Sequence, residues 1–148
     1  MSGNLLLFAH AGFTWVMVGI MWSVQLAIYP QFRTVSAADF REYATAHSTR
    51  IVAVLAPFAP LEVVLAFLVW VGRPAGVSGW LAFGSGLLLV VGWVATGLWY
   101  GPLHGRLQTE PYDPALIERL ISTNWARTVL WTLRGFLATA MLWVSAMI

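Results

Sequence analysis

The sequence predicts an all-α integral membrane protein built as a four-helix bundle, and two features carry that prediction. Hydrophobic residues make up 59% of the chain and charged residues only 9%, far from the balance of a soluble globular domain. Four apolar stretches each approach or exceed the ~20 residues that a helix needs to cross ~30 Å of hydrocarbon. They cover roughly 5–29, 51–72, 78–100 and 125–147. We therefore expect residues 1–148 to form a single four-span transmembrane domain, with the lipid bilayer as a partner.

The first apolar stretch is expected to stay in the protein as a membrane span. The leading segment MSGNLLLFAH has no basic region, and no small-residue cleavage site precedes Trp22, so a signal peptide is not indicated. The chain has no cysteine, which excludes disulfides, haem thioether links and thiolate metal sites. The net charge of +2 and the dispersed arginines do not favour nucleic-acid binding.

The second and fourth helices are expected to begin outside the bilayer, on the side of the long loops. Ser36 followed by Asp39 is typical of a helix N-cap, and Asp113, directly before a proline, is a second such start. Each of these helices would then be considerably longer than the ~20 residues of a span. Pro57 and Pro60 predict a kink in the second helix.

The arginines predict the orientation in the membrane. The segments 30–50 and 101–124 lie on one side of four spans, and both termini lie on the other. Several arginines accompany the first side, whereas only Arg73 accompanies the second. Those on the first side are Arg33, Arg41, Arg50, Arg106, Arg119 and Arg127. The positive-inside rule then places the long loops in the cytoplasm and both termini outside, in what we expect to be a bacterial plasma membrane.

A spacing in the first apolar stretch recurs in the third. A tryptophan, a polar residue and a tyrosine stand at positions i, i+3 and i+7 in both stretches. The two sets are Trp22, Gln25 and Tyr29, and Trp93, Thr96 and Tyr100. One interpretation is a duplicated pair of helices related by an axis along the membrane normal. The other is coincidence in a chain that is rich in aromatic residues.

Polar and aromatic residues on three helices predict a ligand pocket. A stripe on one face of the fourth helix consists of Asn124, Arg127, Trp131 and Arg134. If this stripe converges with the two repeated sets, together they line a cavity open toward the long loops. Mostly apolar sites with a few convergent polar groups are typical ligand sites. The candidate ligand-binding residues are Trp22, Gln25, Tyr29, Trp93, Asn124, Arg127 and Trp131.

Glu62 is a carboxylate inside an apolar stretch, where an ionisable group is costly and needs a partner. At ~1.5 Å per residue it lies about 18 Å deeper than Arg50, and Arg134 lies about 10 Å deeper than Arg127. Both side chains lean toward the long loops, so Glu62 and Arg134 are expected to form a buried ion pair. Either the pair fixes helix packing, or Arg134 holds an anionic or carbonyl-bearing ligand while Glu62 moves protons.

His47 and His104 are expected at one level near the long-loop surface. Three interpretations are open: the two histidines are an acid–base pair, they are metal ligands, or they are ordinary polar residues of solvent-exposed loops. His10 lies about 30 Å from that level and should not share their site. Haem and metal are only weakly indicated, because tetrahedral zinc needs more ligands than two histidines and both side chains are too shallow for a core haem. The candidate catalytic residues are Glu62, Arg134, His47 and His104; no metal ligand and no cofactor is assigned.

Several short motifs resemble the small four-helix membrane proteins of the anthrone-oxygenase-like group, many of which are domains of unknown function. The motifs are WSVQLAIYPQF at 22–32, F-x-x-Y-x-x-x-H at 40–47, Glu62 in the second helix, and PLHGRL at 102–107. The resemblance implies, as in some members, cofactor-free oxygenation of polycyclic aromatic anthrones. The group's usual Pro-x-Asn appears here as Pro102-Leu103-His104. A more distant similarity is to haem-associated four-helix oxidases that begin with a histidine and a tryptophan in helix 1.

Three functions from different classes remain open on the sequence alone. The first is an enzyme that acts on a hydrophobic small molecule, aromatic or quinone-like. The second is a non-enzymatic accessory subunit of a larger membrane complex that carries redox centres or pigment. The third is a small transporter or proton relay that uses Glu62. A homo-oligomer would suit the third by placing Glu62 in a ring.

Overall fold

The structure is a computed structural model that describes residues 3–147, and every regular element within them is helical. Four helical columns of 31 to 33 residues are long and apolar enough to cross a membrane. The first column is α1 (Gly3–Ser23), a π-helical turn (Val24–Ile28) and a 3-10 turn (Tyr29–Arg33), and the second is α2 (Phe40–Gly72). The third is α3 (Gly79–Ala95), a second π-helical turn (Thr96–Tyr100) and α4 (Gly101–Thr109), and the fourth is α5 (Pro114–Ala146). The predicted all-α four-helix membrane bundle is confirmed.

All four columns are longer than a bilayer is thick. At ~1.5 Å per residue each extends for roughly 45–50 Å, against ~30 Å of hydrocarbon. The predicted extension of the second and fourth helices is therefore present in α2 and α5. The first and third columns extend as well, to Arg33 and Thr109, beyond the ends expected near 29 and 100.

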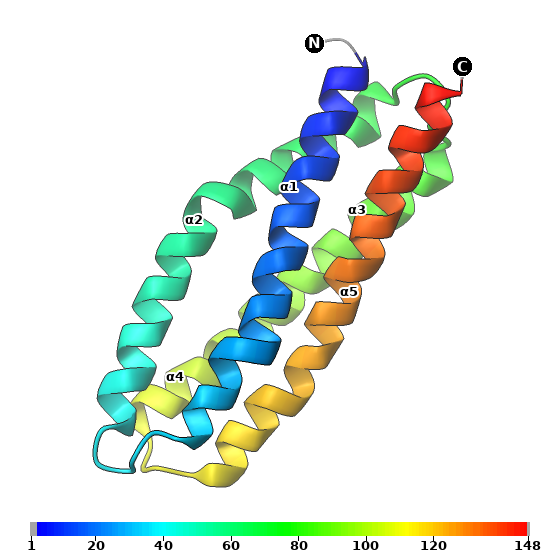
Figure 1. Ribbon diagram of the computed structural model, residues 1–148. Helices are drawn as coiled ribbons and strands as arrows, with labels where there is room; N and C mark the ends of the chain where they lie inside the picture. The colour runs from blue at the N-terminus through cyan, green and yellow to red at the C-terminus, as the bar shows by residue number, and fades with distance from the viewer. Residues whose placement is uncertain (1–2, 148) are drawn as a thin grey trace.

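The columns form a ring in which each one packs against two neighbours. Helix α1 contacts α2 and α5, and α3 contacts the same two helices from the other side. Figure 1 shows both termini and the α2–α3 connection at one end, with the two other connections at the opposite end. Helix α5 begins where Asp113 Oδ1 accepts a hydrogen bond from the Ala115 N–H at 2.8 Å, as expected. Ser36 makes a turn with Asp39 instead, and α2 begins after Asp39.

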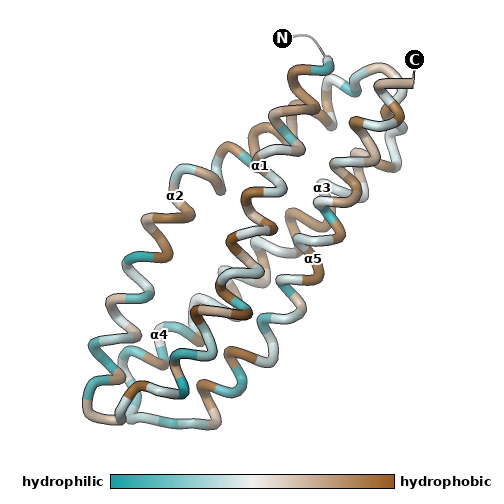
Figure 2. The backbone as a smooth tube through the Cα atoms, in the orientation of Figure 1, coloured by the Kyte–Doolittle hydropathy of each residue, from teal (hydrophilic) through white to brown (hydrophobic). Residues whose placement is uncertain are grey.

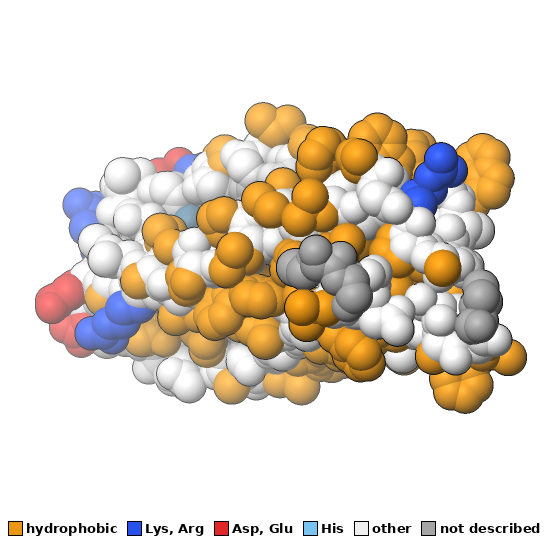
Figure 3. Space-filling model, turned by 90° about the horizontal axis from the view of Figure 1, so that it is seen from above, with side chains coloured by type: hydrophobic (Ala, Val, Ile, Leu, Met, Phe, Trp, Pro, Cys, Tyr) orange, Lys and Arg blue, Asp and Glu red, His pale blue; other side chains and the backbone are white. Residues whose placement is uncertain are grey.

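The outer surface of the bundle is apolar along most of its length. Helix α2 buries only 11% of its most apolar window inside the protein, so most of its hydrophobic side chains point outward, where lipid can cover them. Figure 2 shows hydrophilic residues gathering toward the end with the long connections. On the face in Figure 3, acidic and basic side chains lie at one end and a single basic group at the other. An outward-facing apolar band with charges at its ends is the surface of an integral membrane protein.

Prolines shape two of the columns. Each π-helical turn is followed by a proline, Pro30 in the first column and Pro102 in the third. A proline ring clashes with the carbonyl four residues earlier, at Leu26 and Leu98, and both of these residues lie within the π turns. The wider π turn accommodates each ring without ending the column. Helix α2, which contains Pro57 and Pro60, is continuous but bends partway along in Figure 1, as the sequence predicts.

The two π turns also bear on the repeated spacing in the sequence. They occupy equivalent places in the first and third columns; the first is followed directly by the buried Tyr29, and the second ends on the buried Tyr100. The helices that contact each other stay the same when α1 is exchanged with α3 and α2 with α5. Any ring of four consecutive helices has this symmetry, so the duplicated helix pair stays a prediction, with coincidence as its alternative.

Candidate functional site

The buried polar residues form two clusters at different depths. The loop-end cluster lies near the long connections and consists of the buried Gln25, Tyr29, His47, Tyr100, Asn124 and Arg127 and the half-buried His104. The deep cluster lies toward the termini and consists of the buried His10, Thr14, Glu62, Ser85 and Arg134 and the half-buried Trp93. The polar residues of the expected cavity are thus divided between two levels.

Two histidines and a tyrosine make the centre of the loop-end cluster. The Tyr29 hydroxyl lies 2.9 Å from His104 Nε2, within hydrogen-bonding distance. The rings of His47 and His104 stack with centroids 5.6 Å apart and 26° between their planes. Tyr29 follows the first π turn, His47 lies on α2 and His104 on α4, so three columns bring these groups together. The expectation that the two histidines share one level is met.

Arg127 adds a positive charge to this cluster. Its side chain is buried, at 7% exposure, and its Cζ lies 4.6 Å from the centroid of the Tyr100 ring. The guanidinium also lies beside the Tyr29 hydroxyl and contacts Met21 Sδ at 3.6 Å. None of the ion pairs within residues 3–147 includes Arg127. A buried cation without a carboxylate partner is costly, and such a group commonly marks a site for an anion.

Gln25 and Asn124 join the first and fourth columns beside Arg127. Asn124 Nδ2 donates to Gln25 Oε1 at 2.8 Å, and Gln25 Nε2 donates to the Ile121 carbonyl at 3.2 Å. Both side chains are buried. These bonds hold α1 and α5 in register at the level of the cluster, so both predicted polar residues are in the site, as structural supports.

A cleft of about 300 Å³ opens beside His47, at the low end of the size range of ligand pockets. It lies between the end of the first column and α2. Apolar side chains and a few polar ones share its wall, which is formed by Ile28, Gln31, Tyr43, His47, Arg50, Ile51 and Val54. His47 is the group that belongs to both the cleft and the buried cluster, and its buried Nε2 has no hydrogen-bond partner within residues 3–147.

Glu62 and Arg134 form the buried ion pair that the sequence predicts. Both side chains are fully buried, and Arg134 Nη1 is hydrogen-bonded to Glu62 Oε1. The other carboxylate oxygen accepts from Trp131 Nε1 at 3.4 Å, and Arg134 Nε donates to the Ser85 carbonyl at 3.1 Å. The pair therefore ties α2, α3 and α5 together inside the deep cluster.

An apolar layer separates the pair from the loop-end cluster. Met17, Val18, Met21 and Trp131 pack together as one buried group between the two levels. The Arg127 guanidinium approaches the Trp131 ring at 6.0 Å on one side, while the indole N–H faces Glu62 on the other. Glu62 and Arg134 consequently do not share a site with His47 and His104.

The three tryptophans predicted in the pocket, Trp22, Trp93 and Trp131, all lie outside the loop-end cluster. Trp22 is on the outer surface with 38% exposure, where its Nε1 donates to Thr132 Oγ1 at 3.0 Å and its ring packs on Trp125. The π turn that follows Trp22 breaks the i, i+3, i+7 register, so Trp22 does not face the same way as Tyr29. Trp93 packs edge-on against Trp131, with centroids 5.8 Å apart, in the deep cluster.

His10 had no predicted role in a site. It is 1% exposed and lies close enough to Arg134 to feel its charge. Thr14, one helical turn further along α1, is also fully buried. His10 and Thr14 stand at i and i+4, on one face of an apolar helix. This pattern could have indicated from the sequence that a second polar site lies at their level. The expected separation of His10 from His47 and His104 holds.

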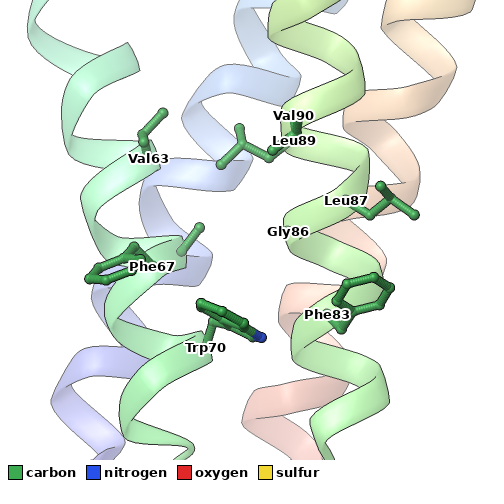
Figure 4. A pocket seen from close by; sticks show the side chains of 9 residues that line it. Val63, Phe67, Trp70, Phe83, Gly86, Leu87, Leu89 and Val90 are labelled. Atoms are coloured by element: carbon green, nitrogen blue, oxygen red, sulfur yellow. The ribbon is translucent and has the colours of Figure 1, made fainter.

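A second cavity, an apolar groove of about 330 Å³, lies on the outer face between α2 and α3 (Figure 4). Its lining includes Phe67, Trp70 and Phe83 and has no ionisable side chain. This groove offers contact with lipid or another apolar molecule but no groups for chemistry.

The loop-end cluster fits neither a metal nor a haem well. Within the described residues there is no group of three or more histidine, cysteine or acidic side chains that could hold a metal ion. The charge of Arg127 beside Tyr29 and His104 also opposes a cation there. A haem iron would need a free imidazole nitrogen from each histidine, whereas His104 Nε2 is already hydrogen-bonded to the Tyr29 hydroxyl at 2.9 Å.

Comparisons of the chain with known protein families, with curated proteins and with solved structures find no match. The function is therefore inferred from the geometry of the loop-end cluster and its cleft.

Proposed function

We propose that the protein is a membrane enzyme that binds a hydrophobic aromatic molecule, with an acidic hydroxyl or keto group, in the cleft beside His47. The observation that carries this proposal is the buried, unpaired charge of Arg127 behind the Tyr29–His104–His47 group. A cation held in this way favours a substrate that becomes an anion during the reaction.

His47 is the proposed general base. It is the one member of the histidine–tyrosine group that lines the cleft, so it can reach a proton on a bound molecule. Removing that proton leaves a phenolate or enolate whose charge spreads over the aromatic rings. General-base assistance of this kind typically contributes about 10²–10⁴-fold to a rate.

Arg127 orders the hydrogen bonds behind the base. A guanidinium only donates hydrogen bonds, so we propose that the lone pairs of the Tyr29 oxygen face Arg127 and that the Tyr29 hydroxyl hydrogen points to His104 Nε2. His104 then carries its proton on Nδ1. The positive charge of Arg127, in a site with little water, favours negative charge at the cleft and opposes a second positive charge on the histidines.

Access from the bilayer suits such a substrate. Ile51 and Val54 form the apolar part of the cleft wall on α2, and Arg50 stands at its polar end. An aromatic molecule dissolved in lipid can lay its rings along the apolar wall and keep its oxygen toward His47 and Arg50. The enzyme would thus take its substrate from the membrane rather than from water.

The resemblance to anthrone-oxygenase-like proteins suggests one specific reaction. An anthrone that loses a proton becomes a carbanion that O2 can oxidise directly. Overall, one anthrone and one O2 give one anthraquinone and one water, so no metal or flavin is required. The base and the buried cation described above are the two groups that this chemistry needs.

The test is turnover by the purified protein in lipid nanodiscs. Anthrone is supplied with O2, and quinone absorbance and oxygen uptake are followed together. His47→Gln and Arg127→Gln are expected to remove most of the enzyme-dependent rate, whereas Trp22→Phe on the outer surface keeps it. If anthrone and simpler acidic phenols neither turn over nor bind, and the native protein remains within a larger complex, the accessory-subunit function is favoured instead.

A transporter that uses Glu62 is not proposed. Glu62 is fully buried, paired with Arg134, and separated from the loop end by the layer around Trp131.

A further inference from the structure

The deep cluster has more hydrogen-bonding groups than its protein partners satisfy. Several of its buried polar atoms have no partner within residues 3–147. They are both ring nitrogens of His10, Thr14 Oγ1, Ser85 Oγ, Trp93 Nε1 and Arg134 Nη2. Buried polar atoms in proteins are nearly always hydrogen-bonded to protein or to ordered water. A concentration of unsatisfied atoms in one layer therefore points to molecules that bind there.

These atoms surround the Glu62–Arg134 pair from several columns. His10 and Thr14 approach from α1, and His10 lies within the electrostatic range of Arg134. Ser85 comes from α3, where its carbonyl already accepts from Arg134. Trp93, also on α3, packs edge-on against Trp131, whose indole N–H donates to Glu62. The unsatisfied groups thus lie around one carboxylate and one guanidinium.

The chemistry of the groups identifies the ligand as neutral. Glu62 and Arg134 cancel each other's charge, so the layer attracts neither an anion nor a cation strongly. The remaining groups are two hydroxyls, an indole and an imidazole, which include both donors and acceptors. Water meets such a mixed set, since a buried water typically makes about three hydrogen bonds to otherwise unsatisfied groups.

Apolar clusters close the layer at both ends. Toward the termini, Leu7, Val69, Val77, Ala82 and Met141 pack together. Toward the long connections, the Trp131 layer stands between the deep cluster and Arg127. Molecules held between these two clusters are enclosed within the bundle rather than part of an open pore.

We propose that the deep cluster is an enclosed hydration site, in which a few ordered waters bridge His10, Thr14, Ser85 and Trp93 to the Glu62–Arg134 pair. The waters solvate the pair inside the membrane and give Glu62 hydrogen-bond partners other than Arg134. This site lies at a different depth from the cleft, so the proposal stands whether or not the protein is an enzyme.

The stability of two conservative variants tests the proposal. Thr14→Val keeps the shape of the side chain, and Ser85→Ala removes a single hydroxyl. If waters bind these hydroxyls, each variant removes a hydrogen bond and lowers the midpoint of thermal unfolding in detergent by roughly 2–4 °C. If the layer is dry, each hydroxyl is a buried orphan, and removing it leaves the midpoint unchanged or raises it. That second result would overturn the proposal.

Thr128→Val is the matched control for Thr14→Val. Thr128 is equally buried, but its hydroxyl donates to the Asn124 carbonyl of its own helix at 3.2 Å. The backbone bond of that carbonyl remains when the hydroxyl is lost. The midpoint of this variant should change less than that of Thr14→Val, which separates the loss of water contacts from a general effect of valine.

A direct measurement uses the indole of Trp93. In protein labelled with ¹⁵N-tryptophan and held in nanodiscs, magnetisation should pass from water to the Trp93 Nε1–H, assigned by its loss in Trp93→Phe. The Trp15 Nε1–H donates to Thr139 Oγ1 at 3.0 Å on the outer surface and serves as the lipid-facing reference without transfer. Absence of transfer to Trp93 contradicts the hydration site even if the variants are destabilised.

Discussion

The Tyr29 hydroxyl and His104 Nε2 lie 2.9 Å apart although the two residues belong to different columns. Each follows a π-helical turn, Tyr29 directly and His104 one turn later, so both proline-adjusted segments contribute to the same contact. The loop-end cluster is therefore assembled from the segments that follow the two π-helical turns, one in each half of the chain.

Replacing Tyr29 by phenylalanine should slow the proposed reaction without unfolding the protein. The ring keeps its packing against Phe32 and His47, while the hydrogen bond to His104 is lost. We expect a fall in kcat with little change in KM, because substrate contacts remain and the orientation of the histidines is relaxed. The loss of stability should be about 1 kcal/mol. Trp22→Phe, which removes a hydrogen bond on the outer surface, is the control; an equal fall in kcat there would contradict the assignment.

Arg127→Met should stabilise the protein and abolish turnover. The substitution removes a buried charge that has no carboxylate partner within the described residues, and methionine can fill much of the same volume. Replacing a buried ion pair by apolar residues is neutral or stabilises by about 1–4 kcal/mol, and we expect a gain of the same order here because no partner is left behind. Chemical unfolding in detergent measures this gain, and Arg127→Lys should show none of it. A marked loss of stability in Arg127→Met would mean that Arg127 has a structural partner.

Arg134→Met should have the opposite effect on stability, although Arg134 lies on the same helix and is equally long. It leaves Glu62 as an uncompensated buried carboxylate, at a cost of about 3–5 kcal/mol. Adding Glu62→Gln should recover most of that loss, since the charge is then gone from both sides. Unfolding of the two single variants and the double variant gives the coupling energy. Additive effects would show that the two residues do not depend on each other.

Gly92→Ala should displace Trp131. A Cβ on Gly92 would lie 2.7 Å from Cη2 and Cζ3 of the Trp131 ring, closer than such atoms approach in proteins. We expect a loss of about 1–3 kcal/mol from overpacking and a change in the near-ultraviolet circular dichroism of the tryptophans. Gly84→Ala on the same helix meets nothing within 4 Å and is the control. Equal stability of the two variants would contradict the close packing of Trp131.

The orientation can be tested with single cysteines, because the chain has none of its own. Ser36→Cys lies in the connection that the arginines place in the cytoplasm, and Gly76→Cys lies in the α2–α3 connection on the other side. A membrane-impermeant maleimide added to intact cells should label Gly76→Cys alone and label Ser36→Cys only after lysis. The reverse pattern would overturn the orientation drawn from the arginine distribution.

The fold and the ion pair were predictable from the sequence because both follow from hydrophobicity and helical rise. Glu62 needed a partner at membrane depth, and Arg134 was the basic residue within reach on another apolar stretch. The side of α1 that Trp22 occupies was not predictable, because an ideal 3.6-residue period ignores the π turn after it. Pro30 was the available signal, but a proline at that place predicts a kink or an end as readily as a wider turn.

The division of the polar residues into two clusters could not be predicted from the sequence either. The stripe from Asn124 to Arg134 gives a face of α5, but not which side chains of the other columns meet it at each level. Trp131 separates the levels only because Gly92 leaves room for its ring. Such close contacts between distant residues depend on tertiary packing and leave no local pattern.

The unpaired charge of Arg127 has a consequence for a protein that sits in an energised membrane. The Glu62–Arg134 pair is neutral overall, so a transmembrane voltage has little effect on it. Arg127 carries a full charge within a span and experiences a share of that voltage, which is worth ~2.3 kcal/mol per elementary charge for a complete crossing of 100 mV. An anion that neutralises Arg127 cancels this energy, so its affinity should vary with membrane potential while the ion pair remains unaffected.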